Sequence, residues 1–181
     1  MKSTFKIISL FFVLILLGCS NEPLPIDQAE LDRAPKGDCP TAFAYCKSSA
    51  VCFDQDGFNR WGWRLGPISP ESNDKCEIYA GAGKCTPGSG TPVGYYEISY
   101  VDDKVIVEYF ANEGYEFTQA HLYVGTDMYP TLPNGKPTVA PGKYPYKKNI
   151  LGGTDYVKFE LTEEFTEDIF VIAHSVVCST N

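Results

Sequence analysis

Glycine and proline interrupt this chain so often that no long helix fits between them. Together they account for 29 of the 181 residues, as 16 glycines and 13 prolines. Both residues weaken or break the interior of a helix. The longest stretch without either residue after the N-terminal region, residues 154–181, is also predicted to be extended. The chain is therefore predicted to fold as an all-β domain.

Short segments rich in Val, Ile, Tyr, Phe or Trp are predicted to be the strands, because turn-forming residues bound each of them. Two of them flank Asp102-Asp103 and are predicted to form a hairpin. About nine strands in one chain of this size favour a single antiparallel β-sandwich domain. A turn of helix is an option for residues 162–167. The predicted strands are residues 42–45, 50–54, 60–65, 76–80, 95–101, 104–110, 117–124, 156–161 and 169–177.

The chain has an odd number of cysteines. If one cysteine has another role, the other six can close three disulfides in an oxidising compartment, although the sequence leaves their pairing open. Zinc is the alternative, but no Cys-x-x-Cys pair occurs and the two histidines lie outside the cysteine-rich part. A disulfide-stapled domain is therefore predicted. The seven cysteines are Cys19, Cys39, Cys46, Cys52, Cys76, Cys85 and Cys178.

The N-terminus has the pattern of an export signal. Two lysines precede an apolar run over residues 7–17, which is too short for the roughly 20 residues of a membrane-spanning helix. The run ends in Leu-Leu-Gly-Cys, which resembles the lipobox of bacterial lipoproteins. The resemblance implies removal of residues 1–18 and attachment of lipid, including a palmitate-type acyl chain, to Cys19. The alternative is an ordinary secretory signal with a coincidental cysteine.

The residues after Cys19 are predicted to link the lipid to the folded domain and to direct its sorting. Residues 19–38 carry three prolines and several charges, a composition typical of a flexible tether. Residues 39–181 are predicted to form the one folded domain. The resemblance to lipoproteins extends to sorting, since Ser20 rather than aspartate implies release to the cell outer membrane. The domain is expected on either the periplasmic or the surface side of that membrane.

Motifs for catalysis are missing, so the protein is predicted not to be an enzyme. His121 and His174 lie in apolar runs, and Ser175 is expected on the opposite strand face from His174. The acids at 163–164 and 167–168 leave a carboxylate-based glycoside hydrolase as a less favoured alternative. Asp54-Gln55-Asp56-Gly57 begins like a calcium loop, but the pattern does not continue. We therefore predict neither a metal nor a cofactor.

Two segments are candidates for ligand binding. Trp61 and Trp63 are expected on one strand face, where coplanar indoles could stack on a sugar if exposed or pack in the core if not. The second candidate is the loop over residues 125–145, which is rich in glycine and proline. The residues predicted to contact a ligand are Arg60, Trp61, Trp63, Arg64, Tyr129, Tyr144 and Tyr146.

Several strings in the chain resemble a group of secreted bacterial β-domains whose activity is uncharacterised. They include Arg-Trp-Gly-Trp at 60–63, His-Leu-Tyr-Val-Gly at 121–125 and Ala-Pro-Gly-Lys-Tyr-Pro-Tyr at 140–146. The resemblance covers most of residues 41–177 and implies an extracytoplasmic domain. It also implies a disulfide between Cys52 and Cys85, and leaves the other four cysteines unassigned.

Charge restricts the partners. The chain has a net charge of −8, and removal of Lys2 and Lys6 with the signal leaves 13 basic against 23 acidic residues. A domain this acidic repels phosphate backbones, so nucleic acid is excluded as a partner. Membrane contact is expected only through the lipid on Cys19. The sequence therefore favours a binding domain for a glycan or a protein, with a structural subunit of an envelope complex as the alternative.

Overall fold

The computed structural model of the protein describes residues 39–70, 72–101 and 104–180. The predicted signal, Cys19, the tether and the Asp102-Asp103 turn lie outside these residues. The described part contains ten strands and four short 3-10 helices. None of these helices has the length and apolar character that a membrane crossing requires.

Most of the predicted strands are present in the structure. The strands are β1 (Thr41–Tyr45), β2 (Ala50–Cys52), β3 (Trp63–Ile68), β4 (Asp74–Ala80), β5 (Thr91–Val101), β6 (Lys104–Ala111), β7 (Tyr115–Gly125), β8 (Tyr146–Thr154), β9 (Tyr156–Glu164) and β10 (Ile169–Ser179). The helices are η1 (Phe53–Asp56), η2 (Gly83–Cys85), η3 (Pro87–Ser89) and η4 (Pro141–Lys143). Residues 162–164, an optional helical turn in the sequence, continue β9 instead.

Strand β8 was not predicted. It pairs only with β7 and is therefore an edge strand. Most of its side chains are half-buried or exposed, so its sequence lacks the alternation of apolar and polar residues that marks a strand with one buried face. The predicted hairpin is confirmed, because β5 and β6 pair without a register shift from Val101↔Lys104 to Gly94↔Ala111.

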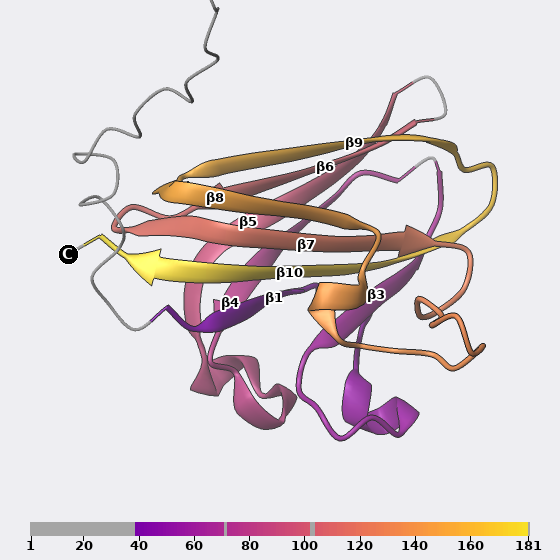
Figure 1. The fold of residues 1–181 in the computed structure, drawn as a ribbon, viewed down its shortest axis with the longest axis horizontal. Coiled ribbons are helices and arrows are strands. Elements are labelled where there is room, and N and C mark those ends of the chain that lie inside the picture. The colour runs from indigo at the N-terminus through magenta and orange to yellow at the C-terminus, as the bar shows by residue number, and fades with distance from the viewer. Residues whose placement is uncertain (1–38, 71, 102–103, 181) are drawn as a thin grey trace, which may run out of the picture.

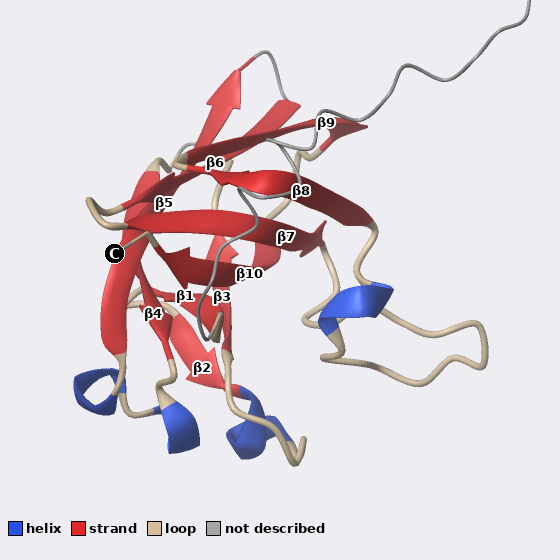
Figure 2. Cartoon of the chain, turned by 60° about the vertical axis from the view of Figure 1, so that its left-hand side comes forward, coloured by secondary structure: helices blue, strands red, loops and turns tan. Residues whose placement is uncertain are grey.

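All the strands are antiparallel and form one sheet. Its order is β2-β3-β10-β1-β4-β5-β6-β9, with β7 added to β10 and β8 added to β7. Strand β10 pairs with β7 along one edge and with β3 and then β1 along the other. The sheet folds over, so that β8, β7 and β10 lie opposite β5, β6 and β9 (Figures 1 and 2).

Aromatic side chains fill the space between the two layers. Tyr109 of β6 is fully buried, with its ring centroid 6.0 Å from that of Phe117 in β7 and 5.8 Å from that of Phe159 in β9. Its hydroxyl donates a hydrogen bond to the main-chain oxygen of His121, at 3.2 Å. The predicted antiparallel β-sandwich is confirmed, with the difference that β1 and β4 join its layers into one continuous sheet.

Three disulfides staple the domain, as the six cysteines of residues 39–181 predicted. Cys52–Cys85, the pair implied by the resemblance, is confirmed and joins the end of β2 to η2. The two unassigned pairs are Cys46–Cys76, between the chain after β1 and β4, and Cys39–Cys178. The last bridge spans 139 residues of sequence and ties the start of the described chain to β10.

The bridge with the longest span should contribute strongly to stability, because it restricts the unfolded chain the most. The double variant Cys39→Ala with Cys178→Ala should lower the free energy of unfolding by about 2–5 kcal/mol. Urea unfolding of the full chain in a mild detergent, followed by tyrosine and tryptophan fluorescence, measures this difference. Wild-type protein with all three bridges reduced should fall at least as far. A double variant as stable as the wild type would contradict this role.

Candidate functional site

A cleft of about 510 Å³ opens where three connections meet. They are the chain between η1 and β3, the η2 turn, and the end of the loop that joins β7 to β8. Phe43 and His174 close it from the sheet side, and Val139 and Pro141 reach it from the loop. A hollow of this size is in the range that holds a small molecule or part of a chain.

Trp61 lies on the wall of the cleft, whereas Trp63 belongs to the core. The Trp61 side chain is half-buried, but Trp63 is only 2 % exposed, and its ring centroid lies 5.0 Å from that of Tyr45. The two indoles meet edge to face, at 80° and 6.0 Å. The two indoles are therefore not a coplanar pair. Of the two alternatives, Trp63 follows the one in which the ring packs in the core, so the prediction that it contacts a ligand is wrong.

Gly62 is the reason why the two tryptophans separate. Its φ of +133° is a conformation that other residues rarely adopt. A side chain there would also collide with the ring of Phe53, 2.5 Å from the position of its Cβ, and with the ring of Phe43. Strand β3 therefore begins only at Trp63. Trp61 stays outside the strand, where its ring meets that of Phe43 edge to face at 5.1 Å.

Polar side chains gather at the rim of the cleft. Asp54, Asn59, Arg60 and Lys84 are all exposed and line it. In the part of the chain that the structure describes, neither Arg60 nor Lys84 takes part in an ion pair. Of the predicted ligand-binding residues, Arg60 and Trp61 are the two that line this cleft.

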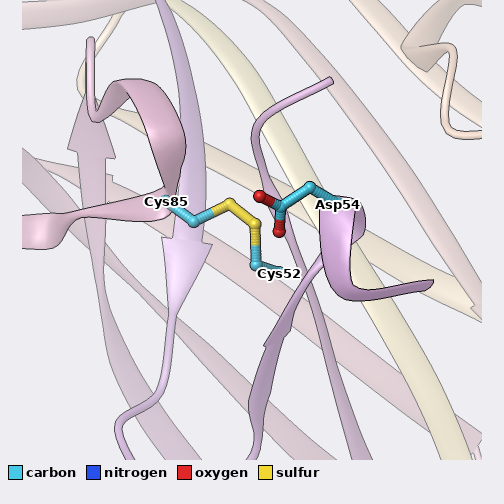
Figure 3. A group of neighbouring side chains, drawn as sticks. All are labelled: Cys52, Asp54 and Cys85. Carbon is cyan, nitrogen blue, oxygen red and sulfur yellow. A yellow bond between two sulfur atoms is a disulfide. The ribbon is translucent and has the colours of Figure 1, made fainter. Parts of the chain in front are cut away.

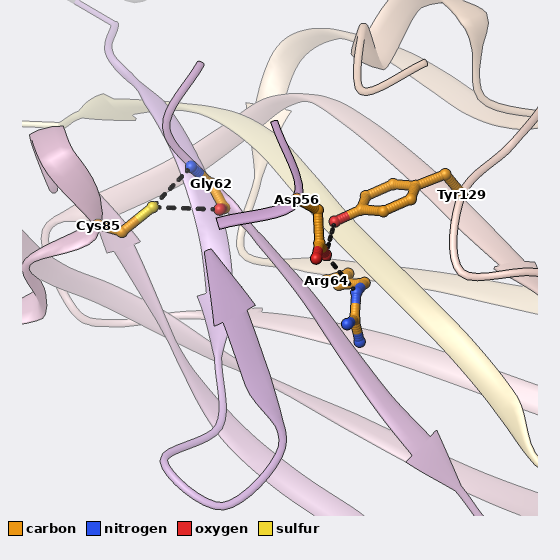
Figure 4. A network of polar contacts seen from close by, with 5 residues as sticks. All are labelled: Asp56, Gly62, Arg64, Cys85 and Tyr129. Atoms are coloured by element: carbon orange, nitrogen blue, oxygen red, sulfur yellow. Dashed lines mark hydrogen bonds and ion pairs between the residues drawn. The ribbon is translucent and has the colours of Figure 1, made fainter. Parts of the chain in front are cut away.

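The Cys52–Cys85 disulfide forms one side of the cleft, with Asp54 beside it (Figure 3). The ligand atoms of the three residues lie within 4.8 Å of one another. Because the two sulfurs are bonded to each other, neither is the thiolate that a metal such as zinc requires. The main-chain amide of Gly62 lies 3.5 Å from the Cys85 sulfur and can donate to it (Figure 4).

The segment that begins like a calcium loop is a 3-10 turn held by a polar cluster. Phe53–Asp56 forms η1, and Gly57 ends it in the left-handed conformation. Arg64 Nε donates to Asp56 Oδ2 at 2.9 Å, and the hydroxyl of Tyr129 donates to the same oxygen at 2.5 Å (Figure 4). The hydrogen bond from Tyr129, followed by Arg64, holds the pKa of Asp56 below its usual value despite partial burial.

This cluster corrects the predicted roles of Arg64 and Tyr129. Both side chains are buried, and their polar groups are directed to Asp56 rather than to the cleft. The guanidinium of Arg64 also lies over the rings of Tyr129 and Phe170, at 5.9 and 5.4 Å from their centroids. Arg64 and Tyr129 therefore attach the β7–β8 loop to η1 and β3.

The other two tyrosines of the loop are also structural. Tyr144 is 1 % exposed, and its hydroxyl donates to the main-chain oxygen of Val139 at 3.0 Å. Tyr146 is half-buried, and its hydroxyl hydrogen-bonds Glu163, which lowers the pKa of that carboxyl. Neither tyrosine lines the cleft, and burial of Tyr144 makes its predicted ligand contact wrong. Phe58 and Lys84 also line the cleft. The sequence did not predict this, because neither residue belongs to a recognisable binding motif.

His174 lies at the floor of the cleft against His121. The two residues are directly opposite on β10 and β7, and their Nδ1 atoms are 3.1 Å apart. One Nδ1 must carry a proton and the other must accept it, so the pair holds two different neutral tautomers. Burial, followed by the neighbouring imidazole, lowers the pKa of His174 to about 3. Burial also lowers the pKa of His121.

The buried imidazole pair should make stability depend on pH. The pKa of His174 is lowered from 6.5 to about 3, so the unfolded chain binds the proton first as pH falls. With respect to this group, the free energy of unfolding is highest above pH 6.5. It falls as the pH is lowered toward 3, by up to about 1.4 kcal/mol per pH unit for each proton.

His174→Gln should therefore reduce the slope of unfolding free energy against pH between about pH 6.5 and 5, above the range in which carboxylates titrate. Urea unfolding at a series of pH values measures this slope. A variant that keeps the wild-type slope would show that His174 is not the group that takes up the proton.

Comparison of the chain with protein-family models, curated proteins and solved structures finds no match. The geometry of the cleft, together with the N-terminal pattern, is therefore the basis for a function. The cleft combines one half-buried indole with a buried imidazole floor and five exposed polar side chains, those of Thr41, Asp54, Asn59, Arg60 and Lys84.

Proposed function

We propose that the chain is a lipid-anchored, non-catalytic binding protein of the bacterial outer membrane, and that its cleft holds a glycan. The observation that carries this proposal is the position of Trp61 on the cleft wall, next to Asn59 and Arg60 on the rim. Sugar rings present apolar C–H faces and a periphery of hydroxyl groups. A half-exposed indole beside hydrogen-bonding side chains is complementary to both.

The make-up of the cleft favours binding over hydrolysis. Asp54 is the one carboxylate among its lining residues in the described part of the chain. Most glycoside hydrolases need two carboxyl groups on opposite sides of the scissile bond. The acids considered for this role in the sequence, at 163–164 and 167–168, do not line the cleft. His174 at the floor is hydrogen-bonded to another imidazole, not to a carboxylate that would orient it as a base.

The anchoring part of the proposal rests on the N-terminus and the cysteines. The lipobox-like Leu-Leu-Gly-Cys at 16–19 follows an apolar run that is too short to stay in a membrane as a helix. Three disulfides in residues 39–181 are typical of a domain in an oxidising compartment. With Cys19 carrying lipid, every other cysteine has a disulfide partner. Ser20 favours the outer membrane over the inner membrane.

A second candidate function is docking to an envelope protein through the outer face of the sheet. Tyr95, Phe110 and Tyr156 lie side by side on β5, β6 and β9, with ring centroids 4.8 and 5.2 Å apart. Tyr156 is 41 % exposed. Aromatic residues in a row on an exposed face are characteristic of protein interfaces. This face lies outside the cleft, so the two functions can be tested separately.

The anchor is tested at its single attachment point. Cys19→Ala should abolish incorporation of labelled palmitate into the chain and shift the protein from the outer-membrane fraction to the soluble envelope fraction, because no acyl chain then holds it. Labelling and membrane fractionation of cells that express each form measure both effects. Persistent palmitate labelling of the Cys19→Ala variant, or association of the wild type with the inner membrane, would contradict the proposal.

The glycan site is tested by removal of its indole. Trp61→Ala should weaken glycan binding by the full chain at least about tenfold, since one aromatic contact contributes about 1.4 kcal/mol. A glycan array followed by calorimetry on the best binders measures the change. Tyr156→Ala is the matched control, because it removes an exposed aromatic ring outside the cleft. If the wild type binds no glycan and Tyr156→Ala releases a co-purifying envelope protein, the second candidate replaces the first.

A further inference from the structure

We infer that the glycan held by the cleft is acidic, an oligosaccharide whose rings carry carboxylates, and that Arg60 and Lys84 recognise this charge. The inference rests on the proposed function, because it names the class of glycan that the same cleft would bind. It goes beyond that function in assigning the specificity to two exposed cations rather than to the indole.

The distribution of charge favours an anionic ligand. The chain carries 23 acidic and 15 basic residues. The lining of the cleft reverses this excess, with Arg60 and Lys84 against Asp54 alone. The ion pairs among the described residues use other cations, namely Arg64, Lys75 and Lys158. Two unpaired cations at one cleft of an acidic domain create a local positive potential that attracts an anion.

A hollow next to the cleft favours a ligand longer than one sugar ring. A second hollow of about 280 Å³ lies next to the cleft and shares Phe58, Asn59, Arg60 and Val139 with it. The two hollows are therefore neighbours, and Arg60 belongs to the lining of both. An oligomer that occupied both hollows would contact Arg60. Arg is suited to this position because its planar group binds a carboxylate through two parallel hydrogen bonds.

The backbone conformation at Lys84 and Cys85 also favours a functional role for this turn. Lys84 and Cys85 have φ values of 57° and 52°, a left-handed conformation that residues other than glycine seldom adopt. The disulfide from Cys85 to Cys52 ties this turn to the end of β2. Unfavourable backbone conformations of this kind are concentrated at functional sites, where the surrounding structure maintains them. Here the turn places Lys84 in the lining of the cleft.

The aromatic wall favours a sugar over an acidic peptide as the source of the carboxylates. Among the described residues, the rings that meet Trp61 are Phe43 and Trp63, and both do so edge to face. In the part of the chain that the structure describes, no ring is stacked in parallel on the indole, and stacking is the contact that the flat face of a pyranose would make with it. Asn59 and Asp54 add hydrogen-bonding groups for ring hydroxyls.

The experiment compares three probes on the full chain in a mild detergent, by calorimetry at low ionic strength. The first is a tetramer of galacturonic acid, and the second is its methyl ester, which has the same rings without the charge. The third is a tetrapeptide of glutamate, which has the charge without the rings. We expect the acidic tetramer to bind at least about tenfold more tightly than either of the other two.

Charge-removing variants identify the cations. Arg60→Gln and Lys84→Gln should each weaken binding of the acidic tetramer about five- to tenfold and reduce its dependence on salt. Lys104→Gln is the matched control, because it removes the same charge from an exposed position on β6 outside the cleft. Its affinity should equal that of the wild type. Circular dichroism verifies that each variant is folded.

The remaining outcomes separate this inference from the proposed function. If the acid and the ester bind equally and both depend on Trp61, the inference is overturned while the glycan site stands. Equal or tighter binding of the glutamate peptide would assign the cations to a protein ligand and overturn the inference. An equal effect of Lys104→Gln would reduce the preference to overall charge and also overturn it. If neither these sugars nor any other glycan binds, both proposals fail.

Discussion

Strand β10 is hydrogen-bonded along both of its edges, and the positions of the other elements depend on it. One edge carries β7 over ten paired positions, and the other carries β3 and then β1. Backbone groups of a buried strand must find partners, so each of these neighbours is fixed in register. The apolar run from Val171 to Val177 supplies the central part of the core at the same time.

The cleft follows from this arrangement. Strand β10 brings His174 opposite Phe43 of β1 and His121 of β7, which forms the floor. Strand β3, paired to the first half of β10, directs the chain before Trp63 toward that floor. The β7–β8 loop is returned to the same place by the hydrogen bond of Tyr129 to Asp56. Residues far apart in sequence therefore meet at one site without any local motif.

Local signals predicted the fold well. The positions of most strands, the β5–β6 hairpin and the presence of disulfides depend on residue type and local spacing, and they were predicted, whereas several strand ends, β8 and two of the three disulfide pairings were not. The site was predicted only in part, because Gly62 breaks the alternation that the expected Trp61 and Trp63 platform assumed. Burial of Tyr144 and the approach of Lys84 to the cleft depend on long-range packing, which no local pattern encodes.

The Cys39–Cys178 bridge has a mechanical consequence. It lies where β1 begins and β10 ends, on neighbouring antiparallel strands, and Val177 donates to the carbonyl of Pro40 beside it. A pull on the chain ahead of Cys39 would otherwise peel β1 from β10 one hydrogen bond at a time. The covalent link passes the load directly into β10, the strand with the most paired neighbours. A domain held at this end can therefore bear tension without opening its sheet.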